Sequence, residues 1–191
     1  MITTTQNINI WGKGKLGIFL VGGGGSGGSG SFWRANKGGS SGFFKYKVID
    51  LSDDSKISVS IEIGQGGSGS FYANGKSTTL SADSLQTITA DGGGKNGGKG
   101  WSMGGGGDWI RGSFNGAGAN GSGDILPNLC QNLQISPGNG GDGTSKGGGG
   151  GGGVVINGKK PLGQSSTGEG YGAGGNTLSN GSPGAALIMT C

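Results

Sequence analysis

Glycine accounts for 53 of the 191 residues, against a usual share of about 7%, while hydrophobic residues make up 30% and charged residues 13%. The net charge of +4 comes from scattered basic residues without a basic cluster, which argues against nucleic acid as a partner. Histidine, the commonest general base and metal ligand, is absent, and no apolar run is long enough to span a membrane. Composition therefore disfavours enzymes, metal sites and membrane-inserted proteins.

The N-terminal residues predict short antiparallel strands. Residues 6–11 alternate polar and apolar side chains, and residues 16–21 are nearly all apolar. The glycines and lysines at 12–15 favour a turn between these two strands.

Two further runs predict a β-hairpin. Residues 42–49 are rich in aromatic side chains, and residues 56–63 alternate strictly, with isoleucine or valine at every second position. The polar residues 51–55 between them favour a turn. We expect these two runs to pair with each other.

Later parts of the chain contain further strand signals. Asn74-Gly75 is typical of a tight hairpin turn, and residues 85–90 read as a strand. Residues 154–156 and 185–189 also read as strands, and we expect the last to pair near the start of the chain.

Runs of glycine dominate the second half, and the longest covers residues 147–153. An ordered glycine run needs partners for its backbone N–H and C=O groups, because unpaired buried ones are rare. Without Cβ atoms, such segments can pack closely as left-handed, polyproline-II-like rods that hydrogen-bond to their neighbours. We therefore predict an all-β fold of short antiparallel strands plus packed polyglycine-II-like rods, with no significant helix.

The composition changes at residue 91, which suggests two parts. Residues 1–91 would form a β-rich, glycine-containing module, and residues 92–191 a glycine-rich rod module that ends in a C-terminal strand. The same pattern is compatible with one continuous domain.

Motifs for small ligands are weak. Residues 64–69 match a dinucleotide-binding glycine pattern, but no helix follows, and such matches are expected by chance at this glycine content. Cys130 and Cys191 lack metal-site spacing, and the sequence leaves open whether they form a disulfide. We expect no cofactor, no metal and no catalytic residues.

Large side chains set among the glycines are the best functional candidates, because Trp, Tyr and Arg dominate binding hot spots. Projecting from loops between rods, they would contact a receptor; alternatively, they cover the flat glycine faces and fill the core. The candidate receptor-binding residues are Trp101, Met103, Trp109, Arg111, Phe114 and Tyr171.

The order of strands and glycine runs along the chain resembles that of a known family. An apolar strand at residues 18–21 runs into glycines 22–25, the strand at 57–63 ends in Gly-Gln-Gly-Gly, and residues 168–175 precede a last strand. These features are similar to the glycine-rich domains of bacteriophage tail-fibre tips. The resemblance implies an adhesin built from packed glycine rods with receptor-contacting loops at its distal face.

We therefore expect a non-enzymatic phage virion protein, a tail-fibre tip or receptor-binding adhesin that contacts the host cell surface. Its partners would be a host surface glycan or outer-membrane protein and other virion tail proteins. The alternative is a self-assembling structural subunit of an extracellular filament or of a capsid or tail decoration. We expect a homo-oligomer or filament, located in the virion or outside the cell, without a signal peptide.

Overall fold

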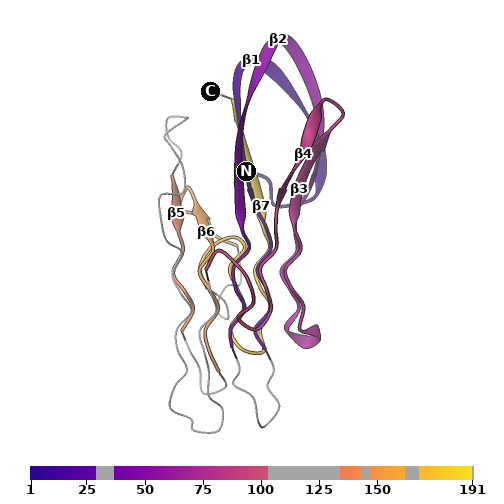
Figure 1. Ribbon diagram of the computed structural model, residues 1–191. Helices are drawn as coiled ribbons and strands as arrows, with labels where there is room; N and C mark the ends of the chain where they lie inside the picture. The colour runs from indigo at the N-terminus through magenta and orange to yellow at the C-terminus, as the bar shows by residue number, and fades with distance from the viewer. Residues whose placement is uncertain (29–36, 103–133, 143–146, 162–167, 191) are drawn as a thin grey trace.

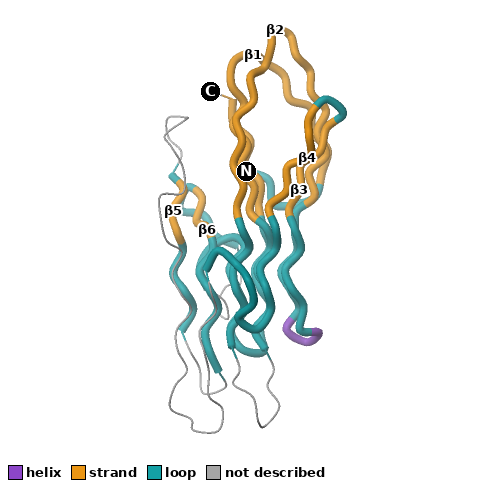
Figure 2. The backbone as a smooth tube through the Cα atoms, viewed as in Figure 1, coloured by secondary structure: helices purple, strands orange, loops and turns teal. Residues whose placement is uncertain are grey.

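The computed structural model describes residues 1–28, 37–102, 134–142, 147–161 and 168–190. Two regions follow each other along one long axis (Figure 1). In the first, the sheet region, the chain forms β-strands; in the second, the glycine region, it runs in extended segments outside any strand (Figure 2). The only helix among the described residues is the three-residue 3₁₀ turn η1 (Gly69–Phe71), so the all-β class is confirmed.

The longest strands, β1 (Gln6–Val21) and β2 (Phe44–Glu62), form one antiparallel ribbon. The ribbon bends over at its middle, so that its two halves come down beside each other (Figure 2). Neither expected turn is present: residues 12–15 belong to β1 and residues 51–55 belong to β2. The two runs of β2 do not pair as a hairpin, because each finds its partner in a different half of β1.

A bulge at the bend explains why both turn predictions are wrong. Gly12 pairs with Ser55 and Gly14 pairs with Leu51, so three residues of β2 stand opposite one residue of β1. Gly12 and Gly14 have φ angles of 143° and 103°, in a region that residues with a Cβ rarely adopt. The glycines and polar residues that we read as turns therefore make a bend within paired strands.

Three more strands complete the main sheet, whose order is β4-β3-β2-β1-β7. β3 (Thr78–Ala82) and β4 (Leu85–Ala90) form a hairpin beside β2, and β7 (Ala185–Thr190) pairs with residues 16–21 of β1. β5 (Ile135–Pro137) and β6 (Val154–Ile156) form a separate two-stranded sheet. The strands expected at residues 85–90, 154–156 and 185–189 are confirmed, as is the pairing of the last with the start of the chain.

Two hydrophobic clusters hold the sheet region together. The first draws on both halves of the ribbon and includes Ile18 and Leu20 of β1 with Ile61 of β2, all 0% exposed. The second lies between β1, β7 and the two-stranded sheet, and its members include Phe19 and Val154. Burying each such side chain contributes about 1.5–3 kcal/mol, so the apolar strands supply the conventional core that the glycine segments lack.

The glycine region is held by backbone hydrogen bonds with a regular pattern. Residues 22–28, which continue from β1, donate to three other segments in turn. The first, fourth and seventh N–H groups reach residues 37–43, the second and fifth reach residues 73–76, and the third and sixth reach residues 179–182. The partner thus repeats every three residues, which is also the number of residues per turn of a polyproline II helix.

The hairpin turn expected at Asn74-Gly75 is wrong. Close contact between backbone segments explains the glycine at position 75 instead. The Gly75 N–H donates to the Gly93 carbonyl oxygen at 2.9 Å, and a Cβ on Gly75 would lie 1.9 Å from the Gly23 carbonyl oxygen. Gly75 is therefore a packing position inside the bundle. The chain reverses earlier, at η1 and Tyr72.

Candidate functional site

Three turns gather at the end of the glycine region that lies away from the strands, and we call them the loop end. They are residues 68–73, which include η1, residues 95–98 and residues 176–180. Each joins two segments of the glycine region, so the bundle fixes where the turns lie (Figures 1 and 2).

Hydrogen bonds tie these turns to one another and to the bundle. The Gly69 N–H donates to Asn180 Oδ1 at 2.7 Å, and the Leu178 N–H donates to the Gly28 carbonyl oxygen at 3.1 Å. Gly28 also lies against Asn96, since a Cβ on Gly28 would stand 2.4 Å from Asn96 Oδ1. The loop end is therefore a connected surface on a hydrogen-bonded support.

This surface exposes large apolar side chains. Phe71 is 83% exposed and Leu178 is 49% exposed, whereas Tyr72 beside Phe71 is half-buried. Among the described residues, Phe71 is the most exposed large hydrophobic side chain. Aromatic and aliphatic side chains held out on a fixed support are suited to bind another macromolecule.

Backbone strain coincides with these exposed side chains. Tyr72 has a φ angle of 50° and Leu178 a φ angle of 66°, both in the left-handed region. This conformation costs a residue with a Cβ about 1–2 kcal/mol, and strain of this kind tends to persist at functional sites. Two of the three described turns thus carry a strained, bulky residue where glycine or asparagine would fit better.

The candidate residues from the sequence fall into two groups. Met103, Trp109, Arg111 and Phe114 lie outside the described residues, so their proposed role stays a prediction. Trp101 and Tyr171 lie within the described residues.

Tyr171 belongs to the second hydrophobic cluster, and Trp101 packs against it. Trp101 is half-buried and meets Phe44 edge-on, with ring centroids 5.5 Å apart. Tyr171 is 5% exposed, exchanges backbone hydrogen bonds with Val154, and burial raises the pKa of its phenol. In this chain their positions match the alternative reading, in which aromatic side chains cover the glycine segments and fill the core.

Sequence reasoning missed Phe71 and Leu178. Phe71 lies just before Asn74-Gly75, where the sequence favours a hairpin turn, and Leu178 sits between polar residues with no motif of its own. The usable signal is a bulky apolar residue within a short run of Gly, Ser and Asn, where neither strand alternation nor a helix can bury it.

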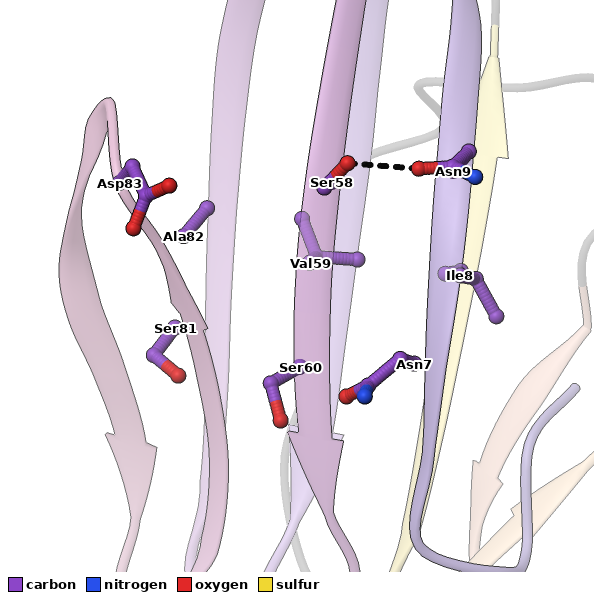
Figure 3. A pocket seen from close by; sticks show the side chains of 9 residues that line it. All are labelled: Asn7, Ile8, Asn9, Ser58, Val59, Ser60, Ser81, Ala82 and Asp83. Carbon is purple, nitrogen blue, oxygen red and sulfur yellow. Dashed lines mark hydrogen bonds between the residues drawn. The ribbon is translucent and has the colours of Figure 1, made fainter.

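A second feature is a shallow open groove on the outer face of the main sheet, with a volume of about 460 Å³. It crosses β1, β2 and β3 (Figure 3). Ser58 Oγ donates to Asn9 Oδ1 at 2.6 Å across the two strands. The polar side chains that line the groove are Asn7, Asn9, Ser58, Ser60, Ser81 and Asp83.

The ionisable groups of the described residues include an ion pair between Lys160 and Glu169. Within the described part of the chain, no three acidic or cysteine side chains are placed to hold a metal ion. Glu169 accepts a hydrogen bond from Lys160 Nζ at 2.9 Å, which, with the Asn139 backbone N–H, lowers the pKa of its carboxyl. None of the described helical structure is long and apolar enough to cross a membrane.

Comparison with known proteins finds a match to a family defined by its glycine-rich sequence. A family model described as a glycine-rich domain matches residues 3–187, which is nearly the whole sequence. No curated protein matches the chain.

Proposed function

This chain belongs to the glycine-rich domain family, and from that premise we propose that it is a bacteriophage virion protein, a tail-fibre tip that contacts the host cell surface. The loop end would make that contact, and other tail proteins would hold the rest of the molecule. The exposed, strained apolar turns at the end of a hydrogen-bonded bundle are the observation that carries this proposal.

The glycine region suits the body of such a tip. Its segments would be polyglycine-II-like rods, and the three-residue repeat of hydrogen-bond partners along residues 22–28 supports this assignment. Because each rod is bonded to several neighbours, local opening must break bonds on more than one side. A body of this kind would hold the loop end in place outside the cell.

Binding to bacterial cells tests the role of the loop end. We expect the fluorescently labelled protein to bind cells of a host strain found by screening a panel of bacteria. Phe71→Ala combined with Leu178→Ala should lower this binding by about tenfold or more, since buried aromatic anchors at interfaces are worth about 2 kcal/mol or more.

Phe43→Ala is the matched control, because Phe43 is an exposed phenylalanine outside the loop end. It should bind cells as the wild type does, with both variants showing a folded circular dichroism spectrum. Equal binding by the wild type and the loop-end double variant would contradict the assignment of the contact surface.

A self-assembling subunit is the second candidate function, and the edges of the main sheet favour it. β4 and β7 are the outer strands of the order β4-β3-β2-β1-β7, and an outer strand can pair with another chain. Negative-stain electron microscopy of the purified protein separates the two candidates. Discrete particles of one size support a tip, whereas long uniform polymers would reject it in favour of a filament subunit.

A further inference from the structure

The groove on the outer face of the main sheet is built from aligned polar side chains. Asn7, Ser60 and Ser81 stand in one row, because Asn7 pairs with Ser60 and Ser60 pairs with Ser81 in the strand register. Asn9 and Ser58 form the next row and share a hydrogen bond (Figure 3). Amide and hydroxyl groups both donate and accept hydrogen bonds, so the rows offer both kinds of partner to a ligand.

The rows continue into an exposed cation–π pair, Trp11 and Lys56. Trp11 lies two residues beyond Asn9 on the same face of β1, and Lys56 lies opposite it on β2. Trp11 is 65% exposed, and Lys56 Nζ is 4.8 Å from the centroid of its ring. A large indole surface thus stands at one end of the groove, outside the hydrophobic core.

We propose that this groove binds a neutral oligosaccharide, with Trp11 stacking on one sugar ring and the asparagine and serine rows bonding hydroxyl groups of the next. Sugar rings present an apolar C–H face and a rim of hydroxyls, so they require an aromatic surface beside closely spaced donors and acceptors. The inference stands on the groove, so it holds whether or not the proposed tail-fibre tip is correct.

Other ligand classes fit the groove less well. A nucleic acid or other polyanion would meet Asp83 in a groove that no lysine or arginine lines, whereas phosphate binding needs several basic groups. An extended peptide binds by adding to a strand edge, whereas the groove lies over the face of three hydrogen-bonded strands, where Ser60 of β2 pairs with both Asn7 and Ser81. Because the groove is polar and nearly uncharged, a neutral ligand rich in hydroxyl groups fits it better than a polyanion or a peptide.

Nuclear magnetic resonance titration tests the proposal on the whole chain. The probes are soluble neutral oligosaccharides built from glucose, galactose, mannose or N-acetylglucosamine, added to about 10 mM because single-groove sites bind weakly. We expect at least one to shift the Trp11 indole N–H signal, assigned with Trp11→Phe, together with the Asn7 and Asn9 side-chain amide signals. The dissociation constant should change little with salt, since the ligand is neutral.

Variants localise the binding. Trp11→Ala and Asn9→Ala should each weaken affinity by about tenfold, whereas Trp11→Tyr should keep part of it, because a phenol ring also stacks. Gln86→Ala, an exposed polar change on β4 outside the groove, should leave affinity unchanged. Because Trp11 is largely exposed, these variants should keep their thermal stability.

Two results would overturn the inference. If no neutral oligosaccharide shifts the groove signals at the highest concentration, the groove is not a saccharide site. If shifts appear only at residues outside the groove, or if Trp11→Ala binds like the wild type, the site lies elsewhere. The loop-end double variant should bind the sugar normally, so failure of the tail-fibre proposal and failure of this one are distinguishable.

Discussion

Gly150 lies so close to Gly174 that a Cβ atom on Gly150 would stand 1.9 Å from the Gly174 carbonyl oxygen. Gly150 is also held by its own N–H, which donates to Asn176 Oδ1, and by its carbonyl, which accepts from Gly141. Alanine at 150 must therefore displace backbone that is bonded on several sides. We expect Gly150→Ala to lower the free energy of unfolding by about 3 kcal/mol or more, measured by urea denaturation.

Gly17→Ala is the control for this prediction. A Cβ on Gly17 would meet Met189 Cε at 3.3 Å and Tyr46 Oη at 3.7 Å, and both belong to side chains that can adjust. We expect a change of about 1 kcal/mol or less, because Gly17 lies in β1, where alanine is no worse than glycine. Similar losses in the two variants would argue against backbone contact as the reason for glycine in the bundle.

Substitution of Ser26 in the glycine region should raise stability, unlike the substitution of Gly150. The Ser26 side chain is 0% exposed within the glycine region, and its Oγ has no hydrogen-bond partner among the described residues. A buried hydroxyl without a partner costs about 1–3 kcal/mol, and alanine keeps the Cβ that the site already accommodates. Ser26→Ala should therefore raise the free energy of unfolding by about 1 kcal/mol. A loss of stability would mean that the hydroxyl is satisfied in solution, for example by water.

How much of the fold could be predicted depends on how local each signal is. The strands at residues 85–90 and 154–156 are predictable because strand-forming residues such as valine, isoleucine and threonine gather within a few positions. The hairpin expected from residues 42–63 was wrong because β1 is long enough to pair with both of its runs, and partner choice is not a local property. Asn74-Gly75 misled for a related reason, since Gly75 is required by contact with Gly23.

The candidate site was less accessible to sequence reasoning. An isolated aromatic residue among glycines can project outward or cover the bundle, and the local sequence is the same in both cases. Tyr171 lies between Gly170 and Gly172, both with left-handed φ angles, and it is buried. Phe71 follows a similar run of glycine and serine, yet it is exposed. Only the arrangement of the distant segments distinguishes the two.

The ion pair between Lys160 and Glu169 predicts a small dependence of stability on pH. The pKa of Glu169 in the folded chain lies below its ordinary value of 4.5, so its stabilising effect is present above pH 4.5 and is lost as the pH falls through the folded value. The side chains are 54% and 32% exposed, so solvent screening limits the effect to about 0.5 kcal/mol. When the pH is lowered from about 6 to about 3, Lys160→Met should therefore lose less stability than the wild type. Chemical denaturation at each pH measures the free energy of unfolding of both proteins. An identical loss in both proteins would contradict the pairing.

Substitution of Leu178 tests whether the strained backbone of the loop end is needed for binding. The Leu178 φ angle of 66° suits asparagine better than leucine, so Leu178→Asn should raise the free energy of unfolding by about 1 kcal/mol. The same change removes an exposed apolar side chain and should weaken binding to host cells. Leu85→Asn is the control, because Leu85 opens β4 in ordinary extended backbone and should lose stability. Thermal denaturation and cell-binding assays on the same preparations measure both effects. A Leu178→Asn variant that is more stable and still binds fully would show that the strained leucine has no part in recognition.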